Sequence, residues 1–280
     1  MSHGLPIEVE SIAEHLFFTT VRILAETPDG VSIGTGFIFS HTKNDSSYAF
    51  IVTNKHVVKD SKKGRIIFHK ADDKKPSRDA IEVNVEDFDK FWVGHPSEDI
   101  DVTIGPFGDL YEEMKKRNQE IFFRAVPSDL IPTGEKLKEI DAFEQVIFIG
   151  YPTGLSDTFN NTPISRTGIT ATPVILDYEG KKSFLIDASV FPGSSGSPVF
   201  IYNPGSHPDK KGGLVAGTRI LFVGILTRML YQEEEGRVEF KEIPSNSVPY
   251  IKSKRSIDLG LVFKSDTILE TIDEFLKTRP

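Results

Sequence analysis

The sequence predicts an all-β protein with two β units, each a barrel or a sandwich, and an α-helix at the C-terminus. Three observations support this prediction. Short runs rich in Val, Ile, Phe and Thr recur at intervals of roughly ten residues, and turn signals such as Pro28-Asp29-Gly30 separate them. These runs form two series of six, without the alternating helices of a βαβ array. The last residues instead show the apolar spacing of a helix.

A polar, charged stretch separates the two series of predicted strands. The first series consists of Phe17–Ile23, Thr35–Phe39, Tyr48–Thr53, Arg65–His69, Ala80–Val85 and Asp101–Ile104. The second consists of Gln145–Tyr151, Ile164–Pro173, Ser183–Ala188, Ser197–Ile201, Arg219–Thr227 and Leu259–Phe263. The polar stretch is Tyr111–Asp141, and its first part, Tyr111–Glu120, is expected to be helical. Two further segments, Tyr202–Gly213 and Gln232–Arg255, are expected to be surface loops. We therefore expect an N-terminal arm (1–15), a first β unit (16–110), a connection (111–142), a second β unit (143–263) and a C-terminal helix (264–280).

The C-terminal helix is predicted from its apolar face and its first turn. Thr267 and Glu270, three residues apart, have the pattern of a capping box. Such a helix is expected to dock its apolar face on the rest of the protein. The apolar residues at helical spacing are Ile268, Leu269, Ile272, Phe275 and Leu276.

Composition excludes several classes of function. The 280 residues include no cysteine, which rules out disulfides, a zinc site with Cys ligands and a thiol nucleophile. With 33 basic and 41 acidic residues the net charge is −8, so we expect no nucleic-acid partner. No apolar run approaches the ~18 residues of a membrane span, and the first residues lack the features of a signal peptide. A cytoplasmic protein without a membrane partner is therefore expected.

The hexapeptide Gly193-Ser194-Ser195-Gly196-Ser197-Pro198 is the sharpest local pattern. A serine nucleophile needs a tight turn that exposes its hydroxyl while backbone N–H groups converge on one point. Gly193 and Gly196 allow the dihedral angles of such a turn, and the amides of Gly193 and Ser195 could form an oxyanion hole. On its own, the pattern is equally compatible with an ordinary Gly/Ser turn that leads into a strand.

A serine nucleophile also requires a base and a carboxylate. His56 directly follows a strand-like run, a place where a histidine can equally be satisfied by a local carbonyl group. Asp99 and Asp101 open a later strand and are both candidates for the carboxylate, although acids at such positions are commonly solvated. The other histidines show no H-E-x-x-H spacing, so no metal ion or other cofactor is predicted.

Taken together, the three sites have the order His, Asp, Ser of chymotrypsin-like enzymes. The chain at this point resembles the chymotrypsin-fold, trypsin-like serine peptidases, and most closely their cysteine-free bacterial, HtrA-like branch. Gly34-Thr35-Gly36-Phe37 resembles the start of that branch's second strand, and Val52-Thr53-Asn54-Lys55-His56-Val57-Val58 resembles its histidine box. Asp101-Val102-Thr103-Ile104 is similar to its aspartate strand, and Gly150-Tyr151-Pro152 stands where the first strand of the second barrel ends. The resemblance extends from about Phe17 to Leu276.

The resemblance implies two six-stranded antiparallel β-barrels with an active site between them. It implies a serine endopeptidase in which Ser195 is the nucleophile, His56 the base and Asp101 the carboxylate, with an oxyanion hole formed by the amides of Gly193 and Ser195. The family pattern favours Asp101 over Asp99 because apolar, small and apolar residues follow it. Ser194 replaces the aspartate of digestive relatives, so no zymogen activation by a new N-terminus is expected. The remaining residues are too few for a PDZ domain.

The resemblance also places the substrate-binding pocket. Ser189 lies six residues before the nucleophile, where trypsin-type enzymes carry an aspartate. The opposite wall is expected from the segment that contains Thr227 and Arg228, where Arg228 could instead attract acidic groups, and Gly260 matches a position where glycine keeps the pocket open. Without a fixed negative charge this pocket should not favour Lys or Arg, and a small or medium apolar residue is expected at P1 of a protein or peptide substrate.

Three other readings compete with a protease. A chymotrypsin-fold module that only binds or regulates would need neither the triad nor an oxyanion hole. An α/β-hydrolase esterase needs the order Ser, Asp, His, and the single G-x-S-x-G match, Gly30-Val31-Ser32-Ile33-Gly34, leads into a strand and not a helix. A structural assembly protein would leave the three motifs unexplained. The oligomeric state is open.

Overall fold

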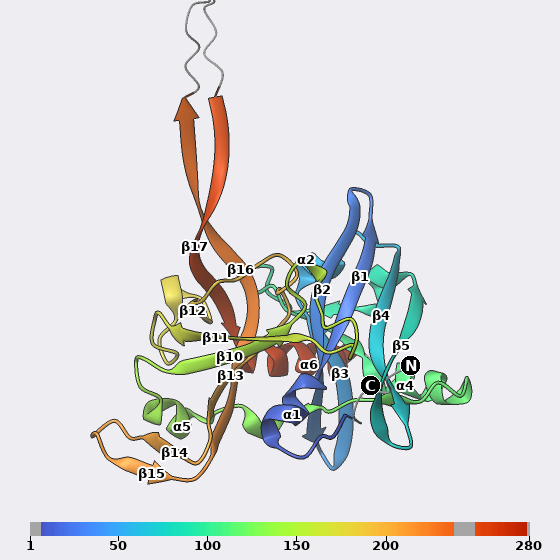
Figure 1. Cartoon of the computed structure of the whole chain (residues 1–280), viewed down its shortest axis with the longest axis horizontal. Helices are drawn as coiled ribbons and strands as arrows, with labels where there is room; N and C mark the ends of the chain where they lie inside the picture. Colours follow the sequence, from blue (N-terminus) through green and yellow to red (C-terminus); the bar gives the residue numbers. More distant parts are fainter. Residues whose placement is uncertain (1–6, 238–249, 279–280) are drawn as a thin grey trace, which may run out of the picture.

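The computed structural model describes residues 7–237 and 250–278, and two β units lie side by side in it (Figure 1). The first unit is a nine-stranded sheet in which all pairs are antiparallel except β2 with β9. Its main path runs in the order β5-β4-β1-β2-β3-β7-β6, with β8 beside β4 and β9 beside β2. The strands are β1 (Thr20–Thr27), β2 (Gly30–Lys43), β3 (Ser46–Thr53), β4 (Lys63–Asp72), β5 (Lys75–Glu86), β6 (Val93–Gly94), β7 (Thr103–Pro106), β8 (Ile121–Phe122) and β9 (Val126–Pro127).

The second unit is a closed barrel of six strands in the order β10-β11-β12-β17-β16-β13. A separate hairpin, β14-β15, projects from it. Its strands are β10 (Gln145–Gly150), β11 (Ile164–Thr170), β12 (Ser183–Asp187), β13 (Pro198–Asn203), β14 (Ser206–Pro208), β15 (Leu214–Ala216), β16 (Arg219–Arg237) and β17 (Tyr250–Lys264). The all-β class, the barrel and the C-terminal helix are thus confirmed.

Short helices occupy the connections. They are α1 (Ile12–Phe17), α2 (Lys55–Val58), α3 (Phe88–Phe91), α4 (Phe107–Lys116), α5 (Gly134–Glu139) and α6 (Asp266–Thr278), with 3-10 turns η1 (Ser128–Leu130), η2 (Pro152–Gly154) and η3 (Tyr178–Gly180). Helix α4 begins four residues before the predicted helix because Phe107, Leu110 and Met114 form a buried face at helical spacing.

The number of strands in the first unit differs from the six expected. All six predicted runs form strands there, and β6, β8 and β9 are additional. Each of these three strands has two residues, which is too short to show the alternating pattern from which strands are predicted. They form because partner strands offer free hydrogen-bonding edges, as when Val126 pairs with Phe39 of β2.

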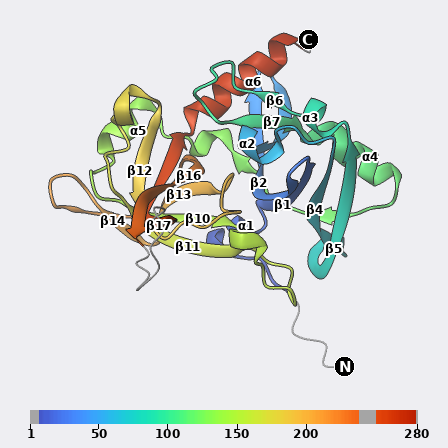
Figure 2. The same cartoon turned by 90° about the horizontal axis from the view of Figure 1, so that it is seen from above.

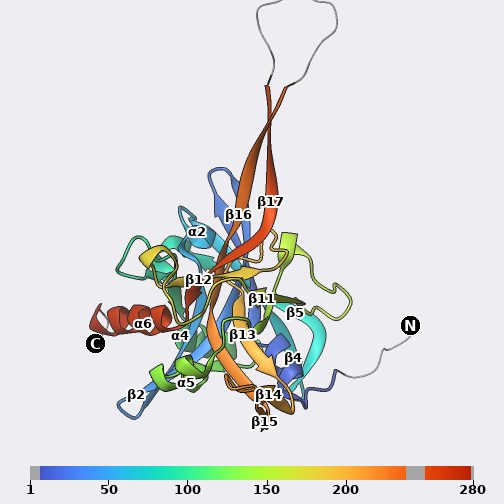
Figure 3. The same ribbon diagram turned by 90° about the vertical axis from the view of Figure 1, so that its left-hand side faces the viewer.

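The predicted loop at Gln232–Arg255 is wrong in its described part. Strands β16 and β17 continue through it as a long two-stranded arm, which projects beyond the barrel in Figures 1 and 3. The register pairs Glu233 with Lys254 and Glu235 with Lys252. Residues 238–249 of the same prediction lie outside the described residues. The segment has a polar composition, which is typical of loops, but the backbone of its described part pairs with the neighbouring strand and is therefore extended.

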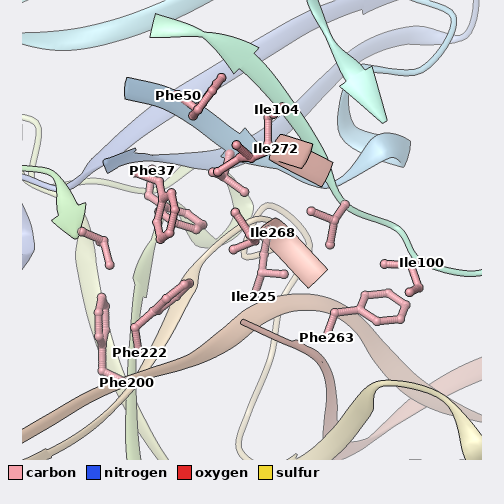
Figure 4. Packing of buried hydrophobic residues seen from close by; sticks show 14 of the residues in the cluster. Phe37, Phe50, Ile100, Ile104, Phe200, Phe222, Ile225, Phe263, Ile268 and Ile272 are labelled. Atoms are coloured by element: carbon pink, nitrogen blue, oxygen red, sulfur yellow. The ribbon is translucent and has the colours of Figure 1, made fainter. Parts of the chain in front are cut away.

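An apolar core joins the two units and the C-terminal helix. Phe37 and Phe50 reach it from the first unit, while Phe200, Phe222 and Phe263 reach it from the barrel (Figure 4). The rings of Phe37 and Phe222 pack edge to face with centroids 5.4 Å apart. Each such buried ring contributes about 2–3 kcal/mol of transfer free energy. This shared core fixes the relative position of the units, and with it any site between them.

Helix α6 closes this core along one side, as Figure 2 shows. Ile268 and Ile272 are fully buried in it, so the predicted docking face is confirmed. The predicted capping box is wrong, because the helix begins at Asp266 and Thr267 lies within it. The Thr267 hydroxyl donates to the main-chain oxygen of Lys264, and Glu270 instead accepts a hydrogen bond from His95 of the first unit.

None of the helices in the described part of the chain is long and apolar enough to span a membrane. Within the same residues, no group of three or more His, Asp or Glu side chains is arranged to hold a metal ion.

The stability of the first unit should depend on pH through His69. Burial lowers the pKa of His69 to about 4, partly offset by the main chain of Ser77, whereas the ordinary value is 6.5. Between these values the unfolded chain binds a proton that the folded chain does not. The stabilisation is therefore complete above pH 6.5 and is lost as the pH falls toward 4. By pH 4.5 the loss amounts to about 2.5 kcal/mol.

His69→Phe, which keeps a ring next to Phe18, should reduce the pH dependence of the free energy of unfolding by about this amount. Urea unfolding at pH 7 and pH 4.5 measures the difference for both proteins. Equal pH dependence in wild type and variant would show that His69 is not the group responsible.

Candidate active site

His56 and Asp101 are brought together at one end of the first unit. Strand β3 ends at Thr53, and the chain turns into α2, whose second residue is His56; Asp101 lies two residues before β7, the neighbour of β3. The Nδ1 atom of His56 lies 2.6 Å from Oδ2 of Asp101, and the main-chain N–H of His56 donates to Oδ1 at 3.0 Å. One carboxylate thus holds both the ring and the backbone of the histidine.

The surroundings keep Asp101 ionised and fix its orientation. Asp101 is 5% exposed, and the Thr227 hydroxyl donates to its Oδ2 at 2.9 Å. Burial raises the pKa of Asp101. The hydrogen bonds and charge interaction with His56, together with the Thr227 hydroxyl, lower this pKa by more than burial raises it, so the net pKa is below the ordinary value. A carboxylate only accepts hydrogen bonds, so Nδ1 of His56 carries the hydrogen and Nε2 presents a lone pair.

Asp99, the alternative carboxylate, lies elsewhere. Its side chain is 75% exposed, and its ion-pair partner is Lys181, at 3.4 Å. Asp101, by contrast, is held at its main chain as well as at its carboxylate, because the side-chain amide of Asn54 donates to the Asp101 main-chain oxygen at 2.7 Å. Of the two acids, the structure places Asp101 against His56.

Ser195 approaches this pair from the barrel. Its hydroxyl donates to the main-chain oxygen of Thr227 at 3.0 Å, and the Thr227 side chain contacts Asp101. Among the hydrogen bonds of the described residues, none joins Ser195 to His56. Rotation about a single side-chain torsion moves a serine hydroxyl between staggered positions, so the hydrogen bond to Thr227 does not fix Oγ in one place.

The loop that carries Ser195 consists of two consecutive turns. In the first, Phe191-Pro192-Gly193-Ser194, the Ser194 N–H donates to the Phe191 oxygen and Gly193 has φ +87°, as the third position of a type II turn requires. In the second, the Ser197 N–H donates to the Ser194 oxygen and Gly196 has φ +89°. A Cβ at Gly196 would lie 1.8 Å from the Thr35 oxygen, so only glycine fits there.

Within the two turns, the main-chain N–H groups of Gly193 and Ser195 have no acceptor among the described residues. The carbonyl groups that share their peptide planes are both held: Pro192 O accepts from the Thr153 N–H, and Ser194 O accepts from Ser197. In a trans peptide the C=O and N–H groups point in opposite directions. The two free N–H groups are therefore directed away from the protein interactions that hold the loop, as an oxyanion hole requires.

The predicted pocket residues are only partly brought together. Ser189 is half-buried and Arg228 is exposed, so both can be reached from solvent. Thr227 is 1% exposed, and its hydroxyl donates a hydrogen bond to Asp101 and does not face an open pocket. Gly260 also differs from expectation, because a Cβ there would meet Val190, Leu226 and Ile186 in the barrel core. Glycine at position 260 therefore serves core packing.

The sequence motifs assign no role to the side chains of Phe191 and Arg166, which lie next to this site. Phe191 begins the first turn of the loop and is 42% exposed. The Arg166 guanidinium of β11 lies 4.8 Å from the centroid of its ring, a cation–π contact. No local motif indicates Arg166, because it lies in β11, far in sequence from the loop that carries Ser195.

Comparison with known proteins identifies the family. The family model for the trypsin-like peptidase domain matches residues 34–204 of the chain, a stretch that includes His56, Asp101 and Ser195. The chain belongs to the trypsin-like peptidase domain family. This membership confirms the family that the motifs predict, that of the trypsin-like peptidases. A comparison with curated proteins found no match.

Solved structures show the same fold at low identity. Two structures of the HtrA-type protease AlgW with a tripeptide, one of them a variant, are 16% and 15% identical to this trypsin-like peptidase domain, with a TM-score of 0.50. Each match covers 95% of this chain, which spans 62% and 63% of the two AlgW chains, a little under two thirds of their length. A serine endoprotease from Yersinia pestis is 14% identical over 98% of this chain and 68% of its own, with a TM-score of 0.48.

Proposed function

We propose that the protein is a serine endopeptidase in which Ser195, His56 and Asp101 form the catalytic triad. The observation that carries this proposal is the buried Asp101 carboxylate, which accepts hydrogen bonds from both the ring and the main chain of His56. A buried carboxylate that orients one imidazole and leaves its Nε2 free has the role of the aspartate in a triad. The two unpaired amides next to Ser195 provide the second requirement, a site for developing negative charge.

In the proposed reaction the Ser195 oxygen attacks the carbonyl carbon of a peptide bond while His56 Nε2 takes the hydroxyl proton. The carbonyl oxygen becomes an oxyanion and accepts hydrogen bonds from the amides of Gly193 and Ser195. Asp101 stabilises the imidazolium without itself taking the proton. The intermediate then breaks the C–N bond, and His56 gives its proton to the leaving amine. Water repeats the sequence on the acyl-enzyme, releases the acid and restores the serine.

The wild-type protein should release fluorescent peptides from fluorescein-labelled casein without any added cofactor. Casein is an unfolded substrate and therefore offers many sequences to the site. Absence of peptide release with casein and with a mixed peptide library would contradict the proposal. The same result would favour the binding or regulatory module, an alternative that the hydrogen bond from Ser195 to Thr227 in place of His56 keeps open.

Internal contacts support a loop that needs no proteolytic activation. The carbonyl groups of Pro192, Gly193 and Ser195 accept hydrogen bonds from Thr153 and Thr35, both distant in sequence. Ser194 is buried, and its N–H is paired within the loop. We infer that these contacts replace the ion pair with a new N-terminus that orders the corresponding loop of digestive relatives.

Substrate selection should disfavour a basic residue at P1. Ser189 offers no charge to pair with Lys or Arg, while Arg166 and the exposed Arg228 place positive charge around the site. A cation at P1 would be repelled by like charge. Mass spectrometry of a cleaved peptide library should show cuts after small or medium apolar residues. Frequent cleavage after Lys or Arg would contradict this account of the pocket.

A further inference from the structure

Thr35 of β2 makes an unusual set of contacts for a residue in the first unit. Its hydroxyl donates to the Gly193 oxygen at 2.9 Å and accepts from the Tyr151 N–H at 3.0 Å. Its main-chain N–H donates to the Ser195 oxygen at 2.9 Å. Gly193 and Ser195 belong to the nucleophile loop, and Tyr151 follows β10. One residue of the first unit thus holds both the nucleophile loop and the end of β10 in the second unit.

All polar groups of Thr35 are satisfied in a dry environment. The residue is 0% exposed, and its main-chain oxygen accepts from the Thr53 hydroxyl at 2.7 Å. The space around the hydroxyl is also closed, since a Cβ at Gly150 would lie 2.5 Å from Thr35 Oγ1. A buried hydrogen bond of this kind is costly to lose because water cannot replace the missing partner. The hydroxyl therefore has a single position and a single pair of partners.

The contact with Gly193 bears directly on the oxyanion hole. Gly193 contributes the N–H group of one peptide plane and the carbonyl group of the next. The first plane is held by Thr153 through the Pro192 oxygen, and the second is held by Thr35 through the Gly193 oxygen. The Ser194 N–H of the second plane also donates to the Phe191 oxygen, so the turn and Thr35 hold this plane together. The second plane lies between the two planes that carry the N–H groups of Gly193 and Ser195, and Gly193, with φ +87° and no side chain, allows it to rotate. Loss of the Thr35 hydrogen bond would therefore loosen the plane that sets the relative direction of these two N–H groups.

We propose that the Thr35 hydroxyl is a positioning group that holds the oxyanion hole of the proposed serine endopeptidase in its active form. It does not touch the reacting atoms. It acts through the Gly193 carbonyl group, which it keeps oriented so that the amide groups of Gly193 and Ser195 point to the same place. This inference rests on the proposed function, since an oxyanion hole has a purpose only in acyl transfer.

The test compares Thr35→Val, which removes the hydroxyl with little change of shape, with Thr35→Ser, which keeps it. Thr271→Val is the matched control, because Thr271 in α6 is equally buried and its hydroxyl donates to a main-chain oxygen far from the site. Hydrolysis of 4-nitrophenyl butyrate reports kcat and KM separately. The labelling rate of Ser195 by a fluorophosphonate, whose phosphoryl oxygen occupies the same hole, provides a second readout.

Thr35→Val should lower kcat and the labelling rate by about tenfold to a hundredfold with KM unchanged. Thr35→Ser and Thr271→Val should stay within about threefold of wild type. Equal kcat in wild type and a folded Thr35→Val protein, or a Thr35→Ser protein as slow as Thr35→Val, would overturn the inference. If neither Thr35→Val nor Thr35→Ala folds, as judged by circular dichroism, the hydroxyl supports the whole fold and the inference is likewise overturned.

The wild-type protein separates the two levels of the proposal. Wild type that neither hydrolyses the ester nor is labelled at Ser195 would contradict the proposed function itself. Wild type that does both, together with an unaffected Thr35→Val variant, contradicts only the role of Thr35.

Discussion

Replacement of Ser195 by alanine is expected to lower kcat for peptide hydrolysis by a factor of about 10⁶, as found when the nucleophile of another triad is removed. The reason is that the substitution removes the oxygen atom that forms the acyl-enzyme in the proposed reaction. The amides of Gly193 and Ser195 remain, so a residual rate above that of water is expected. Initial rates on a peptide chosen from the library measure the effect.

Ser194→Ala is the matched control for this substitution. Ser194 is the adjacent serine, but it is buried, and its hydroxyl has no contact with His56 or Asp101 among the described residues. It should keep activity within about tenfold of wild type, since it removes one buried hydroxyl without touching the triad. An active Ser195→Ala protein and an inactive Ser194→Ala protein would reverse the assignment of the nucleophile.

Asp101→Asn is expected to lower kcat by roughly 10⁴. An amide in place of the carboxylate presents N–H groups to the imidazole and favours the tautomer whose Nε2 carries a hydrogen, which cannot accept the proton of Ser195. The side chain keeps its size, so the fold and the contact with Thr227 should persist. Activity measured from pH 6 to pH 9 distinguishes this loss from a simple shift of the pH optimum.

Asp99→Asn provides the comparison that the sequence itself suggests. Asp99 is exposed and pairs with Lys181, an interaction worth little at the surface. It should leave kcat unchanged within about twofold. If Asp99→Asn is the damaging change and Asp101→Asn is harmless, the carboxylate of the proposed triad has been assigned to the wrong residue.

Much of the fold was predictable because its strands are long enough to show a pattern. The twelve predicted runs all form strands, as with Gln145–Gly150, where apolar residues dominate between turn signals. The additional strands of the first unit were not predictable, since two residues carry no period. Strands β16 and β17 were missed in part because charged residues are typical of loops, whereas here each strand is stabilised by the other's backbone.

The catalytic candidates were predictable from their order and local motifs, but their supporting contacts were not. Thr227 contacts Asp101 across 126 residues of sequence, and Thr35 contacts Gly193 across 158. No local pattern reports such a contact, because it depends on how the two units meet. The same limit applies to the pocket. The sequence predicts that Gly260 contributes to it, but only the folded barrel shows that a side chain at position 260 would point into the core.

The proposed function requires Ser195 to be a nucleophile activated by His56. Fluorophosphonate labelling of the whole protein, followed by mass spectrometry of its peptides, tests this requirement. We expect one adduct per chain, located on Ser195, with a labelling rate that His56→Ala reduces at least a hundredfold. An adduct on Ser194, no adduct at all, or labelling of Ser195 that proceeds equally fast without His56 would contradict it.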